Sequence, residues 1–229
     1  MTLDEFLRLV DGITPLLSAL AWPLLVLFVL LRFGPSLHEF FANLGEITGK
    51  FGGFEASVKR ARAEAQTALV AAEVGRPSAV PATPEVTSRK AREAATVATE
   101  AVSARTVRQA RGATVLWVDD RPDNNLLERQ SLEAVGISFV LARSTDEALR
   151  ETARRRFDVI ISDMGRPPDP RAGYTLLKAL RQAGDTTPFV IYASSNAQAD
   201  KDAARAAGAL GSTNRASELF SLVLGALKA

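Results

Sequence analysis

The chain of 229 residues contains no cysteine and a single histidine, His38. Without cysteine it can form neither a disulfide nor a thiolate metal site, and one histidine cannot build a multi-histidine metal centre. An excess of one charge is also lacking, because 28 Lys and Arg residues nearly balance 26 Asp and Glu residues, for a formal net charge of +2. We therefore expect no nucleic acid among the partners of the chain.

The longest stretch without an ionisable side chain runs from Gly12 to Leu31. As a helix it would be about 30 Å long, which matches the hydrocarbon core of a bilayer. A cleaved signal peptide would need a basic N-terminal region, and a helix buried in a soluble domain would show a polar face. Since neither feature is present, we interpret residues 1–34 as an N-terminal anchor with one transmembrane helix.

Basic residues are unevenly distributed around this stretch, with Arg8 alone before it. The basic residues that follow it most closely are Arg32, Lys50, Lys59, Arg60 and Arg62. Because Lys and Arg favour the cytoplasmic side of a membrane, we expect the N-terminus outside and the C-terminal part in the cytoplasm. The sequence therefore predicts a single-pass protein of the inner or cell membrane.

Residues 35–111 connect the anchor to the C-terminal part of the chain. Two alanine-rich stretches, EASVKRARAEAQTALVAAEV and TSRKAREAATVATEAVSARTVRQARG, flank the proline-containing segment GRPSAVPATPEV. The flanking stretches contain good helix formers, but no heptad of large apolar residues supports a coiled coil. We therefore expect a mobile, partly helical juxtamembrane linker.

Residues 112–229 alternate short apolar runs with longer amphipathic stretches. The runs are TVLWV, ISFVLA, DVIIS, PFVIYA and the weaker ALGST. Apolar strands that alternate with helices are typical of a parallel sheet covered by helices on both faces. The sequence thus predicts an α/β domain with a doubly wound, five-stranded parallel sheet. Ser144 and Glu147 form a capping-box pattern, and Gly136, Gly184 and Gly208 each fall where a helix should end.

Three carboxylates follow strands of this expected sheet. Asp119 and Asp120 end the first strand, and Asp163 ends the third. Chemistry in such sheets lies beyond the carboxyl ends of the strands, so the three acids converge if the two strands are adjacent. Three nearby anions need a cation, and an anionic site with oxygen ligands suits Mg²⁺. The sequence therefore predicts a magnesium site that faces a phosphoryl group.

These features resemble the receiver domain of two-component response regulators (CheY-like) over residues 113–228. The shared features are the acid pair, the acid after the third strand, the DDRPDNN loop, STDEAL, Pro167 and Gly173. The resemblance implies a flavodoxin-like fold in which Asp163 is the phosphoacceptor. It also implies that Asp120, Asp163 and the carbonyl of Gly165 hold Mg²⁺, while Asp119 orients a ligand. A histidine kinase or another signalling protein would be the partner, and a homo-oligomer is left open.

Two positions depart from the family pattern. The family usually ends the fourth strand with Thr or Ser, where this chain has Ala193 followed by Ser194. It also places a Lys after the fifth strand, where this chain has Arg215. Arg keeps the charge but differs in shape and reach. We expect Ser194 and Arg215 to belong to the phosphoryl site. Because the three acids are kept and only these two positions differ, the changes put conventional switching in doubt more than metal binding.

Two other classes of function are alternatives to this interpretation. A pseudo-receiver that recruits a partner without phosphorylation, as a membrane-tethered interaction module, fits the two changed positions. A phosphohydrolase or nucleotide-binding enzyme is disfavoured, because no glycine-rich phosphate loop follows the first strand. No DNA-binding segment follows the receiver-like part in this sequence, so we do not expect a transcription factor. We therefore expect a signalling protein and not an enzyme.

Overall fold

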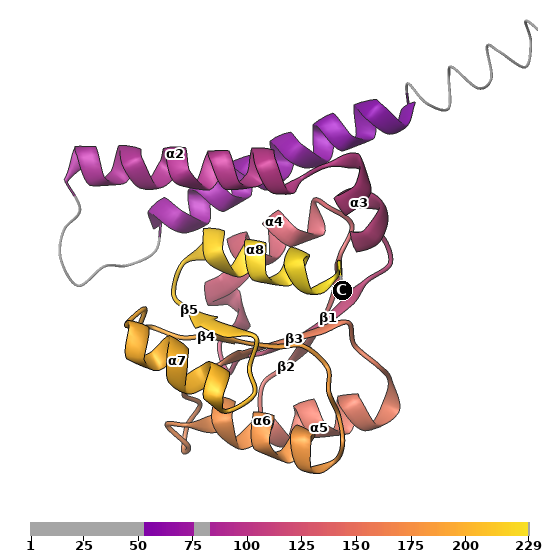
Figure 1. Cartoon of the computed structure of the whole chain (residues 1–229), viewed down its shortest axis with the longest axis vertical. Helices are drawn as coiled ribbons and strands as arrows, with labels where there is room; N and C mark the ends of the chain where they lie inside the picture. Colours follow the sequence, from indigo (N-terminus) through magenta and orange to yellow (C-terminus); the bar gives the residue numbers. More distant parts are fainter. Residues whose placement is uncertain (1–52, 76–82, 229) are drawn as a thin grey trace, which may run out of the picture. The chain divides into compact units, whose positions relative to one another are not determined.

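The computed structural model describes residues 53–75 and 83–228 (Figure 1). The expected transmembrane helix, Gly12 to Leu31, lies outside these residues. Among the residues that are described, no helix is both long enough and apolar enough to cross a bilayer. The anchor therefore stays a prediction from the sequence.

The C-terminal part of the chain is built on a five-stranded parallel sheet with the strand order β2-β1-β3-β4-β5. The strands are β1 Thr114–Val118, β2 Ser138–Ala142, β3 Val159–Asp163, β4 Phe189–Tyr192 and β5 Gly211–Thr213. Each coincides with one of the expected apolar runs, so the predicted parallel α/β sheet is confirmed. In particular, β1 and β3 are neighbours, as convergence of the three acids requires.

Helices cover both faces of this sheet (Figure 1). On one face lie η1 Pro122–Asn125, α4 Leu126–Glu133 and α8 Ala216–Ala226, and on the other α5 Thr145–Arg154, α6 Ala172–Gln182 and α7 Gln198–Ala206. The core beneath α5, α6 and α7 consists of strand residues such as Leu116, Ile160 and Phe189 packed on Leu176 and Leu180 of α6. The apolar strands β1, β3, β4 and β5 are buried between two layers of helices, whereas the edge strand β2 is partly exposed.

Local sequence signals set the ends of several helices. Ser144 accepts a hydrogen bond from the backbone N–H of Glu147 at 3.1 Å, and Glu147 accepts one from the backbone N–H of Arg143 at 2.6 Å. This reciprocal arrangement confirms the predicted cap of α5. Gly136 follows α4 with a φ of 104°, a conformation that residues with a Cβ rarely adopt.

Two helices that precede the sheet pack on the helical layer that covers it, which differs from the expected mobile linker. They cover residues 53–75 and α2 Pro84–Ala101, and we call them the helix pair; the short α3 Ala104–Ala110 then leads into β1. The compact unit begins at Glu55 and not near residue 112. Leu69 in the first helix and Ala94 and Ala98 in α2 are fully buried, and α2 contacts α8.

The sequence signal for this packing was weak because alanine buries little apolar area per residue. A polar contact adds to the apolar ones. The guanidinium of Arg62 donates two hydrogen bonds to the carbonyl of Val102, at 3.1 and 2.7 Å, and so joins the first helix to the end of α2. The helix pair is thus part of the same compact unit as the sheet.

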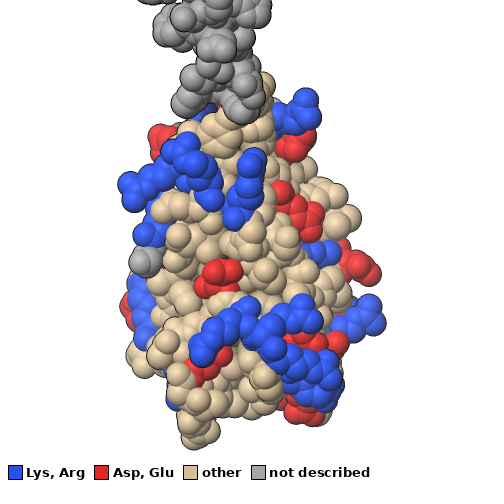
Figure 2. All heavy atoms as spheres, turned by 90° about the vertical axis from the view of Figure 1, so that its right-hand side faces the viewer, with Lys and Arg blue, Asp and Glu red and all other residues tan. Residues whose placement is uncertain are grey.

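Charged side chains of both signs are interspersed over the face of the molecule drawn in Figure 2. This distribution agrees with the small net charge of the whole chain.

Candidate functional site

The three acids predicted from the sequence meet at the carboxyl edge of the sheet. Val118 and Ser162 are partners in the β1–β3 register, so the residues that follow each of them lie side by side. One carboxylate oxygen from each of Asp119, Asp120 and Asp163 lies within 4.8 Å of the others. The parallel pairing of two strands thus brings together residues that lie far apart in the sequence.

Asp119 and Asp120 are held differently. Both carboxylate oxygens of Asp119 accept hydrogen bonds at 2.7 Å, one from the backbone N–H of Arg121 and one from the side-chain amide of Asn125. Asp119 is buried, whereas Asp120 is partly exposed and lies 3.5 Å from the Nε of Arg121. Asp119 is therefore fixed in orientation, and Asp120 is more accessible to a ligand from solvent.

Asp163 lies at the end of β3, half-buried beside the acid pair. Its Oδ1 accepts a hydrogen bond from the backbone N–H of Met164 at 2.7 Å. Burial, followed by the negative charge of Asp119, raises the pKa of Asp163 above its ordinary value. The carboxylate is therefore ionised at some cost, and a bound cation would relieve that cost.

A cavity of about 410 Å³ opens above these acids. Ala193 and Ser194, which follow β4, line it together with the three acids. Ala193 is buried and Ser194 is exposed. The role of the Ser194 hydroxyl in the phosphoryl site stays a prediction. The remaining lining residues are Ala72, Gly75, Arg121, Asn124, Asn125, Leu127, Glu128 and Tyr192. Two of these, Ala72 and Gly75, belong to the first helix of the helix pair.

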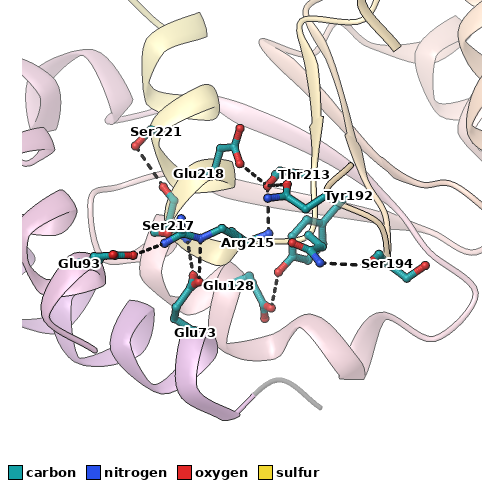
Figure 3. A network of polar contacts seen from close by, with 12 residues as sticks. Glu73, Glu93, Glu128, Tyr192, Ser194, Thr213, Arg215, Ser217, Glu218 and Ser221 are labelled. Atoms are coloured by element: carbon teal, nitrogen blue, oxygen red, sulfur yellow. Dashed lines mark hydrogen bonds and ion pairs between the residues drawn. The ribbon is translucent and has the colours of Figure 1, made fainter. Parts of the chain in front are cut away.

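Arg215, by contrast, does not line this cavity. Its Nε lies 3.1 Å from an oxygen of Glu73, and its Nη2 lies 2.7 Å from an oxygen of Glu93 (Figure 3). The structure therefore pairs the cation that follows β5 with carboxylates of the helix pair instead of with the three acids. These partners are not predictable from the sequence, because both lie more than 100 positions away, in the segment for which the sequence predicts a mobile linker.

Arg166 is a second cation near the acids, and sequence reasoning missed it. It is 3 % exposed, and its guanidinium donates hydrogen bonds at 2.7 Å to the hydroxyl of Ser162 and to the carbonyl of Asp163. Burial lowers the pKa of Arg166, while the charge of Asp163 works against that change. Arg166 thus places a buried positive charge behind the acids and fixes the main chain of the phosphoacceptor candidate.

The donor set fits a magnesium ion. The converging oxygens are carboxylates, and Mg²⁺ prefers oxygen ligands and commonly keeps several waters. Asp120 and Asp163 would hold the ion, and the doubly hydrogen-bonded Asp119 would orient a ligand or its water. Gly165 follows in the loop after β3, where an added Cβ would lie 3.2 Å from the carbonyl oxygen of Pro170. The role of its own carbonyl as a metal ligand stays a prediction.

Comparisons with known proteins agree with this geometry. The family model of the response regulator receiver domain matches residues 115–216, from β1 to the start of α8. This match and the strand order support a response regulator receiver domain in the C-terminal part of the chain. Domains of this class accept phosphoryl groups in signalling, bind Mg²⁺ through an acidic cluster and interact with histidine kinases and other signalling proteins. No curated protein matches the chain.

Several solved structures are similar to the C-terminal half of the chain. The receiver domain of the Francisella response regulator 1452 is 26 % identical, with 51 % of this chain and 98 % of that chain covered and a TM-score of 0.47. The chemotaxis response regulator CheY4 of Vibrio cholerae is 28 % identical, with coverages of 50 % and 98 % and a TM-score of 0.44. A putative response regulator from Chloroflexus aurantiacus is 28 % identical, with coverages of 51 % and 98 % and a TM-score of 0.46.

Proposed function

We propose that the chain is a membrane-anchored receiver protein that accepts a phosphoryl group on Asp163 with the help of Mg²⁺. The observation that carries this proposal is the convergence of three carboxylate oxygens within 4.8 Å at the ends of β1 and β3. A phosphoryl group brought to this edge would meet a nucleophile, a metal position and an open cavity. The resemblance to response regulators makes a histidine kinase the expected donor.

The proposed reaction is a transfer from phosphohistidine to aspartate. An oxygen of Asp163 forms a bond to phosphorus while the bond between phosphorus and the histidine nitrogen breaks, and the imidazole leaves with the electron pair. When bound, Mg²⁺ neutralises charge on the phosphoryl oxygens. The backbone N–H of Met164 orients Asp163, and Arg166 behind it holds the carbonyl of the same residue. Asp119 contributes a fixed negative charge that favours cation binding.

Membrane attachment belongs to the same proposal. The uncharged stretch from Gly12 to Leu31 is long enough to span a bilayer as a helix. The positive charges that follow it favour an outside N-terminus and a cytoplasmic receiver domain. The helix pair would then lie between the membrane and the sheet in the order of the chain.

A second candidate function is a pseudo-receiver that binds a partner without phosphorylation. Two observations favour it. Ala193 brings no hydroxyl to the cavity wall, and Arg215 is occupied by Glu73 and Glu93. In this alternative the acid cluster is retained without accepting phosphate, and the helix pair and receiver domain form one fixed surface.

Beryllofluoride, a mimic of the aspartyl phosphate, distinguishes the two functions. Fluorine NMR of the full-length protein in detergent should show a bound signal that requires Mg²⁺ and disappears in Asp163→Asn. Asp120→Asn should weaken binding strongly, because it removes a metal ligand. The matched control is Asp123→Asn, since Asp123 lies on the same loop but is exposed and outside the cavity lining. A protein that never shows a bound signal would favour the pseudo-receiver.

A further inference from the structure

The guanidinium of Arg215 is the centre of a contact between the receiver domain and both members of the helix pair. Glu73, in the first helix, accepts from Arg215 through one oxygen and from the backbone N–H of Ser217 through the other, at 3.1 and 3.0 Å. Glu93, in α2, accepts from Arg215 at 2.7 Å. Figure 3 shows the two carboxylates approaching the arginine from the helix pair, with Ser217 at the start of α8. We call these contacts the Arg215 latch.

The same helix that supplies Glu73 also reaches the phosphoryl cavity. Ala72, one residue before Glu73, and Gly75, two residues after it, line the cavity above the three acids. Arg215 follows β5, and β5 pairs with β4, whose last residue, Tyr192, lines that cavity too. The latch and the acid cluster are therefore neighbouring features, connected through one helix and one pair of strands.

We propose that the Arg215 latch couples the chemical state of Asp163 to the docking of the helix pair. The inference rests on the proposed function, because it needs a phosphoryl group on Asp163. That group adds negative charge at the cavity. It therefore competes with Glu73 and Glu93 for Arg215, the cation that follows β5. Arg can bind phosphoryl oxygens through two parallel hydrogen bonds, so the competition involves interactions of similar strength.

Because Glu73 is buried, loss of its ion pair with Arg215 would weaken the docking of the helix pair. The side chain of Glu73 is 4 % exposed, whereas the side chain of Arg215 is 39 % exposed and retains access to solvent. If Arg215 turns toward a phosphoryl group, Glu73 keeps the hydrogen bond from the backbone N–H of Ser217 but remains a buried anion without a cation beside it. A buried charge without its partner is strongly unfavourable, so the turn that carries Glu73 moves away from α8.

Two variants of the latch give the first test. Coupling between two events is reciprocal, so weakening the latch should favour the phosphorylated form as much as phosphorylation weakens the latch. In the full-length protein, Glu73→Gln should lower the beryllofluoride concentration at half-saturation by about fivefold or more, the lower end of typical coupling factors. The matched control is Glu64→Gln, an exposed glutamate of the same helix, which should leave this concentration unchanged.

The absence of native cysteine allows a direct measurement of docking. Spin labels on Lys59→Cys in the first helix and Lys178→Cys in α6 occupy exposed positions on the helix pair and on the receiver domain. Addition of Mg²⁺ and beryllofluoride should shift the distance distribution toward longer values. Arg215→Gln, which removes the cation of the latch, should abolish the response of this distance to beryllofluoride.

The outcomes separate the two proposals. A bound fluorine signal together with unchanged distances and an unchanged half-saturation in Glu73→Gln would overturn the latch and leave phosphoryl acceptance intact. Absence of a bound signal in every variant would overturn the proposed function and with it the coupling. A bound signal with a longer distance, abolished by Asp163→Asn, supports both.

Discussion

The phenolic hydroxyl of Tyr192 donates a hydrogen bond of 2.8 Å to Glu128 across 64 positions of sequence. Tyr192 is the last residue of β4, and Glu128 lies in the first turn of α4. Both are buried and both line the cavity above the acids. The ring of Tyr192 also packs edge-on against the ring of Trp117 in β1, with 5.9 Å between the ring centroids. This pair therefore ties the wall of the cavity to the core of the sheet.

Replacement of Tyr192 by Phe tests the contribution of this contact. The change keeps the aromatic packing but removes the donor to a buried glutamate, so we expect a loss of about 1–3 kcal/mol in the free energy of unfolding. For a protein of this size that corresponds to a fall in Tm of about 2–4 °C for each kcal/mol. The chain's other tyrosine, Tyr174, provides the control, and Tyr174→Phe should change Tm much less. Equal effects of the two substitutions would show that the hydrogen bond contributes little.

The hydroxyl of Ser194 is expected to replace the one that Ala193 lacks. If it contacts the phosphoryl group, Ser194→Ala should weaken beryllofluoride binding roughly tenfold, since a hydrogen bond to a charged group is worth about 1.5 kcal/mol or more. Ser195→Ala is the matched control, because the hydroxyl of Ser195 bonds Asp200 at the start of α7. Titration followed by fluorine NMR measures both. Unchanged binding in Ser194→Ala would mean that the phosphoryl group has no hydroxyl partner after β4.

The sheet and the acid cluster were predictable from the sequence for a simple physical reason. The strands are apolar on both faces, so their boundaries show as abrupt changes in composition, and Asp119 and Asp163 mark two of those changes. Parallel pairing then fixes which ends meet. Ala193 and Ser194 directly follow the apolar run of the fourth strand, so their position at the same edge of the sheet was predictable for the same reason.

The contacts of Arg215 and Arg166 could not be predicted in this way. The partners of Arg215 are on helices whose alanine-rich sequence gives little indication of what they pack against. Arg166 lies in an irregular loop, where an arginine is usually exposed, and only the fold shows that it is buried against Ser162 and Asp163. Both cases depend on tertiary packing, which determines the orientation of a long charged side chain.

Membrane attachment is tested by fractionation and reporter fusions. A protein that lacks residues 1–34 should move from the membrane to the soluble fraction, because the uncharged stretch would be lost. Alkaline phosphatase fused to the C-terminus should be inactive, since that enzyme folds only outside the cytoplasm, and the same reporter placed before Gly12 should be active. Recovery of the full-length chain in the soluble fraction would contradict the anchor, and an active C-terminal fusion would contradict the orientation.

The pKa of Asp163 predicts how stability depends on pH. Burial and the charge of Asp119 raise this pKa in the folded protein above its ordinary value. Where the pH is above both the raised and the ordinary pKa, the side chain is ionised in the folded and in the unfolded state, so its charge destabilises the fold by the full amount. As the pH falls through the raised pKa, the folded state takes up a proton first and the penalty declines. Below the ordinary pKa both states are protonated, and no penalty remains.

Asp163→Asn should therefore be more stable than the unaltered protein at pH 7 in the presence of EDTA, because it removes an anion from a site with two others. A gain of about 1 kcal/mol would raise Tm by about 2–4 °C. The difference should narrow as the pH falls toward the ordinary pKa of an aspartate. Mg²⁺ at pH 7 should raise Tm of the unaltered protein more than that of the variant, since ligand binding stabilises the folded state that binds it. A difference in Tm that is independent of both pH and Mg²⁺ would mean that the substitution acts through packing and not through the charge of the cluster.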